Sequence, residues 1–272
     1  MNDDEITGMP DYLFKKYLGI SILWIAFLLL ISCSSSTKKK VEEILLDHDP
    51  PALGVGHAFY YQHTGPRPWS NGLQDASGGR LLVIPEQDAS QAKSLIKYEE
   101  HYESSEGSQV GYIDKKYRLQ QKHIESGDLA LKFIYSPALE LRYLDLKKDK
   151  LKTYKSSFIL HVPGNEAPQG SGNIVSKVER LYDVRIISPA GAYLCRQFSS
   201  DVSIETTVQD VKTVFKAKII TYWCDNIGWF VKEEYAFEPM MRNGKAVQPA
   251  YRAESILSKY KPMDPNSLRP VE

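Results

Sequence analysis

Residues 212–223 read Lys-Thr-Val-Phe-Lys-Ala-Lys-Ile-Ile-Thr-Tyr-Trp, and this stretch decides the fold class. Successive side chains of an extended strand point to opposite faces, so residues two apart share a face. The apolar residues share one face and the lysines the other: Phe215, Ala217, Ile219 and Trp223 against Lys212, Lys216 and Lys218. Such alternation predicts a β-strand with one buried and one exposed face.

The same period of two recurs along the chain. Further runs cover residues 55–62, 109–124, 128–135, 138–144, 152–162, 178–187, 192–198, 202–208 and 229–237. Turn-forming residues separate them, as at Ser136-Pro137 and at Pro163-Gly164-Asn165. Because each strand has one apolar face, the sheet must cover a second sheet, a helix or, as a barrel, itself. We therefore predict a mainly β protein with an antiparallel sheet and few short helices.

Residues 13–33 have the pattern of a lipoprotein signal peptide. Lys15 and Lys16 precede an apolar stretch over residues 20–31, which is shorter than the roughly twenty residues that a membrane-spanning helix needs. The segment ends in Leu-Ile-Ser-Cys at residues 30–33, which is similar to a lipobox. We predict that residues 1–32 are removed and that acyl chains on Cys33 attach the protein to a membrane. The alternative is an N-terminal anchor helix that happens to end in cysteine.

The rest of the chain divides into three parts. Residues 33–50 are predicted to form a lipidated tether, residues 51–238 the β domain, and residues 239–272 an irregular, proline-rich tail with an exception at 253–260. Ser34, which follows the acylated cysteine, is typical of Gram-negative lipoproteins sorted to the outer membrane. We therefore expect a lipid-anchored envelope protein that faces the periplasm. Residues 3–5, Asp-Asp-Glu, are acidic, which is unusual before a signal peptide, so we expect translation to start at Met9.

Three motifs together resemble a known family. They are Pro-Ala-Leu-Gly-Val-Gly-His-Ala-Phe-Tyr-Tyr at 51–61, Ser-Pro-Ala-Gly-Ala-Tyr-Leu-Cys at 188–195, and Thr-Tyr-Trp-Cys-Asp-Asn-Ile-Gly-Trp-Phe-Val-Lys-Glu-Glu at 221–234. They are similar to uncharacterised bacterial envelope lipoproteins that share a domain of unknown function. The resemblance covers about residues 50–238; Asp225-Asn226 departs from it, and residues 65–79 look like an insertion. It implies one curved antiparallel sheet, a β-clam or half-barrel, distantly similar to the lipoprotein-localisation carriers and receptors.

Two cysteines, Cys195 and Cys224, remain once Cys33 is acylated. An even pair in an exported protein indicates a disulfide. Two buried free thiols, or one reactive thiol, are the alternatives.

The sequence contains no recognisable catalytic or cofactor-binding pattern. Its histidines lack partners at metal-ligand spacings, and no phosphate-binding loop or dinucleotide fingerprint occurs. The adjacent carboxylates Glu99-Glu100 and Glu233-Glu234 would point to opposite faces of a strand. The formal net charge is zero, which gives no electrostatic reason to expect nucleic-acid binding. We predict a protein that is not an enzyme and takes no metal or cofactor.

An aromatic group is the most suggestive candidate for binding. Trp69, Tyr222, Trp229 and Phe230 could line a surface for a hydrophobic ligand or a partner protein, or they could pack in the core. We predict a non-enzymatic envelope protein that binds such a ligand or partner. The alternatives are a structural or assembly component and an enzyme acting on cell-wall glycan. An open apolar concavity would favour a ligand, whereas a closed sheet filled by its own side chains would exclude one.

Overall fold

The computed structural model describes residues 56–68, 75–85, 95–103, 108–126, 129–143, 145–165 and 167–262. Within these ranges the chain forms fourteen strands and no helix, so the expected few short helices are not found there. The strands are β1 (Ala58–Thr64), β2 (Gly78–Val83), β3 (Leu95–Tyr102), β4 (Ser108–Asp114), β5 (Arg118–Ser126), β6 (Leu129–Glu140), β7 (Leu151–His161), β8 (Gly170–Ser188), β9 (Gly191–Val208), β10 (Val211–Cys224), β11 (Trp229–Phe237), β12 (Met240–Arg242), β13 (Lys245–Gln248) and β14 (Tyr251–Lys261). The predicted signal peptide and tether, residues 1–50, lie outside the described residues.

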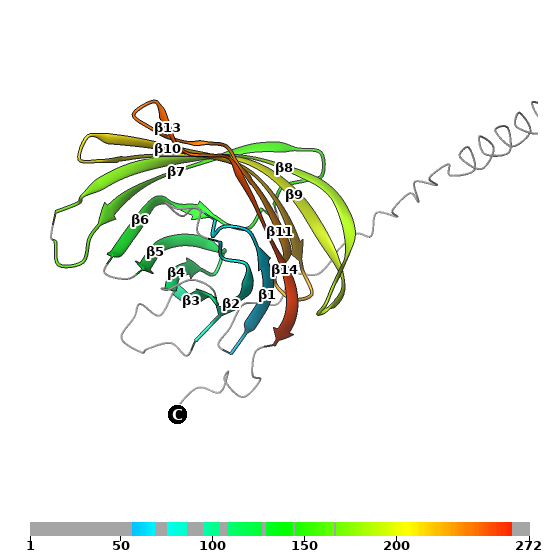
Figure 1. Cartoon of the computed structure of the whole chain (residues 1–272). Helices are drawn as coiled ribbons and strands as arrows, with labels where there is room; N and C mark the ends of the chain where they lie inside the picture. The colour runs from blue at the N-terminus through cyan, green and yellow to red at the C-terminus, as the bar shows by residue number, and fades with distance from the viewer. Residues whose placement is uncertain are drawn as a thin grey trace, which may run out of the picture. The chain divides into compact units, whose positions relative to one another are not determined.

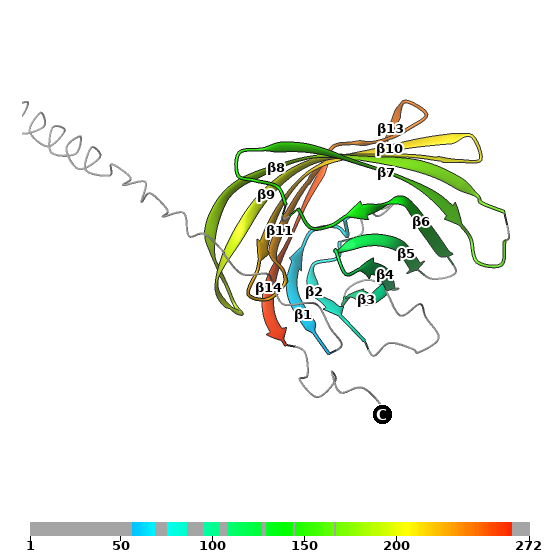
Figure 2. The same cartoon turned by 180° about the vertical axis from the view of Figure 1, so that it is seen from behind.

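The strands form one antiparallel sheet that closes on itself. From β1 to β10, each strand pairs with the next along the chain. Strand β14 pairs with β1 and β11, and β11 pairs with β10, which completes a ring of twelve strands (Figures 1 and 2). The β12–β13 hairpin pairs with the first part of β10 and lies outside the ring. The sheet is therefore a closed barrel and not a clam or half-barrel.

The barrel closes through the tail that we predicted to be irregular except at residues 253–260, and the closing strand β14 covers that exception. Strands β12, β13 and β14 all lie within residues 239–272. Pro249 and Pro262 directly flank the strands and do not interrupt them, which is where a sheet tolerates proline. Ala253, Ser255 and Leu257 of β14 are buried, so this strand fills the gap between β1 and β11.

Most of the strands predicted from alternation are present, but several have other limits; the runs at 192–198 and 202–208, for example, form one continuous strand, β9. The run at 109–124 is two strands, β4 and β5, because the chain turns between Asp114 and Arg118 through Tyr117 at φ 60°. Strand β6 continues through Ser136-Pro137, which we expected to be a turn. Strands β2 and β3 were not predicted, because charged residues occupy inward positions in both and obscure the apolar alternation.

The interior is divided into apolar clusters. The largest, here called the aromatic end, lies where β1 begins and β10 ends and includes Phe59, Tyr61, Trp223 and Trp229, each no more than 4% exposed. The Trp223 ring lies 5.4 Å from Trp229 and 5.6 Å from Tyr117 between centroids. Smaller clusters on β7–β11 and β14 fill the other end. The two faces of β10 follow the predicted alternation, since Ala217 and Trp223 are buried and Lys212, Lys216 and Lys218 are exposed.

Candidate functional site

Charged side chains meet inside the barrel, next to the aromatic end. Arg80 of β2 donates from Nε to Glu100 of β3 at 2.6 Å and from Nη1 to Glu233 of β11 at 3.2 Å. The same Nη1 donates to the hydroxyl of Ser255 on β14 at 2.9 Å. All three ionic side chains are at most 14% exposed. We call Arg80, Glu100, Glu233 and Ser255 the ionic layer.

Neighbouring aromatic side chains complete the ionic layer. The hydroxyl of Tyr102 donates to Glu100 at 3.1 Å, and the hydroxyl of Tyr235 donates to Glu233 at 2.5 Å. The Arg80 guanidinium also lies 5.1 Å from the ring centroid of Tyr61, within cation–π range. The carboxylates are thus held by donors from the barrel itself.

The electrostatics of the ionic layer follow from burial and from Arg80. Burial opposes ionisation of Glu100, but the Arg80 guanidinium and the Lys122 ammonium outweigh it and lower the pKa of Glu100 to about 2. Burial raises the pKa of Glu233, and Arg80 offsets this only in part. Burial also lowers the pKa of Lys122. The two carboxylates contact the same cation, so the ionic layer links strands β2, β3 and β11.

The ionic layer was missed at the sequence level, although one signal was present. Glu99-Glu100 and Glu233-Glu234 were correctly expected to point to opposite faces, and each pair turns one carboxylate inward. The alternation of β3 places Glu100 on the face of Tyr98 and Tyr102, which are both buried. A carboxylate on an apolar face requires a buried partner.

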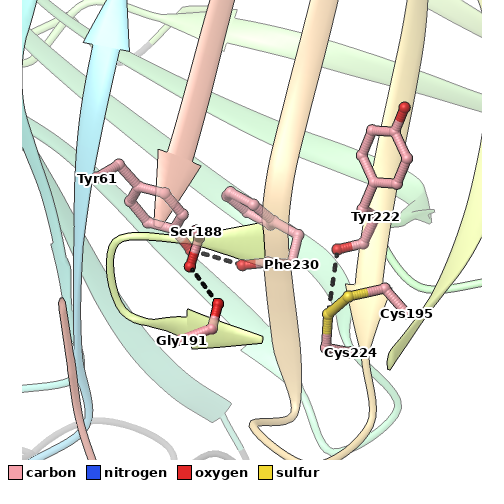
Figure 3. Close-up of a disulfide and its surroundings, with 7 residues drawn as sticks. All are labelled: Tyr61, Ser188, Gly191, Cys195, Tyr222, Cys224 and Phe230. Carbon is pink, nitrogen blue, oxygen red and sulfur yellow. Dashed lines mark hydrogen bonds between the residues drawn. A yellow bond between two sulfur atoms is a disulfide. The ribbon is translucent and has the colours of Figure 1, made fainter. Parts of the chain in front are cut away.

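Cys195 of β9 and Cys224 at the end of β10 form a disulfide, with a Cα–Cα distance of 4.2 Å (Figure 3). Both cysteines are fully buried in the aromatic end. Next to them, Arg196 donates to Asp225 at 2.5 Å, so an ion pair and a covalent bond join the same two segments. Asp225, which follows the disulfide directly, is thus a buried partner of Arg196.

The predicted aromatic surface is mostly core. Trp229 and Phe230 are 4% and 6% exposed, and the Phe230 carbonyl accepts a hydrogen bond from Tyr61 at 2.9 Å (Figure 3). This corrects the suggested ligand or partner surface, because neither ring can contact a partner from inside the packed interior. Tyr222 is half-buried, and its hydroxyl accepts a hydrogen bond from Gln197 at 3.4 Å. Trp69 and Cys33 lie outside the described residues.

The outer face of the barrel carries a groove of about 660 Å³. Cross-strand pairing orders its residues: Lys177 of β8 pairs with Asp201 of β9, which pairs with Lys218 of β10. The row then continues through Ala236 of β11 to Arg252 of β14. Lys216 and Glu238 lie in the next row, and Pro239 and Tyr251 contribute apolar surface. We call this site the outer groove.

The outer groove has an excess of positive charge. Four cations, Lys177, Lys216, Lys218 and Arg252, face two carboxylates, Asp201 and Glu238, and all six are exposed. Within the described part of the chain, none of the four cations forms an ion pair. Adjacent strands lie about 4.8 Å apart, so Lys218 and Arg252 stand roughly 10 Å apart with only the methyl group of Ala236 between them. An anionic group can be held from both sides there.

Other kinds of site are not found in the described residues. Over those ranges no three or more His, Cys, Asp or Glu side chains gather where they could hold a metal ion. None of the described segments forms a helix long and apolar enough to cross a membrane.

The comparisons with known proteins give a distant structural likeness only. No family model matches this chain, and no curated protein matches it. One similar solved structure is a Bacteroides fragilis protein described as a proposed exported protein with a YmcC-like fold. The TM-score is 0.39 and the identity 11%, over 78% of this chain and 99% of that chain. A proposed lipoprotein from Parabacteroides distasonis is similar with a TM-score of 0.39 and 11% identity, over 79% of this chain and all of the other. At this distance nothing about either protein is transferred to this chain.

Proposed function

We propose that this chain is a non-enzymatic, lipid-anchored protein of the cell envelope that binds an acidic segment of a partner protein in the outer groove. The observation that carries the proposal is the set of four exposed cations without ion pairs around a groove of about 660 Å³. Positive charge of this kind attracts an acidic partner and favours rapid encounter.

The packing of the interior supports a partner on the outer face over a hydrophobic ligand inside. The sheet is closed, and Phe59, Tyr61, Trp223 and Trp229 fill the aromatic end. The ionic layer lies beside them and presents charged groups that an apolar ligand would have to displace. An alternative role as a structural component remains compatible with the same packing.

The spacing of the cations favours an extended peptide. Lys216 and Lys218 are two residues apart on one strand, so their side chains repeat about every 6.7 Å. Alternate side chains of an extended peptide have the same repeat. An acidic residue over Ala236 would contact Lys218 and Arg252, while the next residue on the same side of the peptide would lie beside both Lys216 and Glu238.

The membrane anchor rests on the sequence of residues 13–33. In this proposal, acylated Cys33 holds the barrel at the outer membrane, on the periplasmic side. A Cys33→Ser variant should accumulate as an unprocessed precursor and fail to incorporate labelled fatty acid. Normal incorporation in that variant would contradict the anchor without affecting the groove.

The groove is tested by fluorescence anisotropy with a labelled peptide of alternating Glu and Thr. The protein used is residues 34–272, which contain every described strand. We expect salt-sensitive binding that weakens about tenfold when Lys218→Glu and Arg252→Glu are combined, since both contacts to one carboxylate become repulsive. Lys155→Glu, on an exposed position of β7 outside the groove, is the matched control.

Three outcomes would contradict the proposal. Peptide binding that is unchanged in the double variant would show that the groove is not the site. Tighter binding of an acidic polysaccharide than of the peptide would exclude a peptide as the preferred partner. Native mass spectrometry of the protein purified from its host would contradict a filled interior if it showed one stoichiometric lipid.

A further inference from the structure

A carboxylate borders the centre of the outer groove on its β12 side. At this centre, Ala236 lies between Lys218 and Arg252, whose side chains can hold one anionic group from both sides. In the next row toward β12, the exposed carboxylate of Glu238 lies beside Lys216. A second carboxylate of an extended peptide would therefore meet repulsion from Glu238 as well as attraction from Lys216.

The row on the other side of Ala236 holds carboxylates that already have a partner. Ile220 pairs there with Glu234, which pairs with Glu254. The Lys232 ammonium lies 2.6 Å from Glu234 and 3.1 Å from Glu254, so this cation is occupied. Ile220 is half-buried and adds apolar surface. The groove thus fits a single carboxylate with an apolar residue two positions away on either side.

The chain itself contains a segment of this pattern. Residues 42–49 carry four carboxylates and neither lysine nor arginine. In an extended conformation Val41, Glu43 and Leu45 would share one side, because alternate side chains point the same way. That side presents one carboxylate between two apolar residues, as the groove requires. We call residues 41–49 the acidic segment; it precedes Gly56, with which the described structure begins.

The chain is long enough for the acidic segment to reach the outer groove. Ala58 pairs with Lys261 at the end of β14, and Arg252 lies nine residues back along the same strand. At about 3.3 Å per residue, this stretch of β14 is about 30 Å long. Thirteen residues separate Glu43 from Gly56, and an extended chain of that length spans up to about 45 Å. Glu43 can therefore lie over the groove.

Positive charge continues along the route from Gly56 to the groove. Lys259 and Lys261 are exposed on β14, which lies beside β11 (Figure 1). Neither lysine forms an ion pair with another residue in the described ranges. Asp47 and Asp49 precede Gly56 by nine and seven residues and carry the opposite charge. The charge complementarity thus extends over the whole acidic segment.

We propose that the acidic segment occupies the outer groove of its own chain until an acidic partner displaces it. Glu43 lies over Ala236 in the centre, and its apolar neighbours two residues away lie over the flanking rows. Leu45, which is nearer to Gly56, covers Ile220. Because the segment and the groove belong to one chain, the effective concentration is on the order of millimolar, so a weak contact is sufficient. The inference rests on the proposed function, since it names a second occupant of the same groove.

The first test repeats the anisotropy measurement with the labelled peptide of alternating Glu and Thr on residues 34–272. Glu43→Gln removes the competing carboxylate, so this variant should bind the peptide about tenfold more tightly than the parent. Glu42→Gln is the matched control, because Glu42 points to the opposite side of an extended segment and its loss should change the affinity less than about twofold. Deletion of residues 263–272, which follow β14, should leave the affinity unchanged.

The second test measures occupancy of the groove without any peptide. Limited acetylation followed by peptide mass spectrometry reports how accessible each lysine is. In the parent, Lys218 should react about fivefold more slowly than in Glu43→Gln, and high salt should remove this difference. Lys155, which is exposed on β7 outside the groove, should react equally in both.

The outcomes separate this inference from the proposed function. Peptide binding that is equal in the parent and in Glu43→Gln, or equal reactivity of Lys218 in the two, would overturn the inference and leave the proposed function standing. Equal gains in Glu42→Gln and Glu43→Gln, or a gain on deletion of residues 263–272, would overturn it as well. If neither protein binds the peptide while Glu43 still protects Lys218, the proposed function is overturned and the inference is supported.

Discussion

The aromatic end and the ionic layer lie side by side in the barrel and are both buried, yet they are held by different forces. The aromatic end is an apolar cluster that contains Trp223, Trp229 and the disulfide, and the stability that its contacts contribute does not depend on pH. In the ionic layer, one cation serves two carboxylates from strands far apart in the sequence. Removing part of an apolar side chain lowers the stability only by the contacts that are lost. A buried charge that loses its partner, by contrast, destabilises the fold by the full cost of its desolvation. We therefore expect a substitution in the ionic layer to lower the free energy of unfolding more than one in the aromatic end.

The largest expected effect is at Arg80. Arg80→Ala removes the guanidinium that contacts both Glu100 and Glu233 and leaves only the nearby Lys122 ammonium, and we expect a loss of about 5 kcal/mol in the free energy of unfolding by urea at neutral pH. The control combines Arg80→Met with Glu100→Gln and Glu233→Gln, which removes the charges together and should be less destabilising than Arg80→Ala alone. A loss below about 1 kcal/mol for Arg80→Ala would mean that water replaces the guanidinium.

Trp223→Ala tests the aromatic end in the same measurement. Truncating a fully buried tryptophan costs about 4 kcal/mol, since apolar contact is lost and a cavity remains. Trp223 is 2% exposed, and we expect this loss to be the same at acidic and neutral pH. Tyr182→Ala, at an exposed aromatic residue, should leave the unfolding midpoint nearly unchanged. If Trp223→Ala unfolds like the parent protein, then its ring is not part of the core.

The Cys195–Cys224 disulfide is a covalent link within the aromatic end. Its cysteines are 29 residues apart, and removing a bridge of that span costs about 3.5 kcal/mol if the unfolded chain is otherwise unrestrained. We expect this loss for Cys195→Ala combined with Cys224→Ala, and non-reducing peptide mapping of the parent should give one linked peptide. Free thiols at both positions after oxidative purification would contradict the bridge.

Acid should distinguish the two regions. The pKa of Glu100 is about 2 in the folded protein, below its ordinary value, so its ionised form contributes stability at neutral pH. That contribution, on the order of 3 kcal/mol, is lost as the pH falls from about 4.5 to about 2. Urea unfolding across this range should show Glu100→Gln approaching the parent protein as the pH falls, whereas the difference for Trp223→Ala stays constant. If the free energies of unfolding of Glu100→Gln and of the parent protein differ by the same amount at every pH, the depressed pKa of Glu100 is contradicted.

The smallest effect should come from the outer face of β10. Lys216→Ala and Lys218→Ala change exposed side chains without ion pairs among the described residues, so each should change the free energy of unfolding by less than about 0.5 kcal/mol. The same substitutions should weaken binding of the acidic peptide. A large loss of stability would mean that the groove holds the barrel together and is not a binding surface.

The sequence by itself determined which face each of the regular strands buries. On β10 the alternation separates Trp223 from Lys216 and Lys218, and the structure buries the first and exposes the others. The reason is local: a strand's side chains alternate strictly, so one apolar face predicts its own burial. Where inward positions are charged, as at Arg80 and Glu100, the same rule failed and strands β2 and β3 were missed.

The tertiary structure alone decided which strands become neighbours. Alternation assigns a face to Glu100 and to Glu233, but it cannot show that Arg80, which lies 20 residues from the first and 153 from the second, holds both. The ring likewise closes through β14, whose pairing with β1 joins Tyr60 to Lys259 across most of the chain. The outer groove arises from the same pairing, since it places Lys218 and Arg252 on either side of Ala236. A period of two specifies a face and not a partner, because partners are chosen only when all the apolar faces close on one interior.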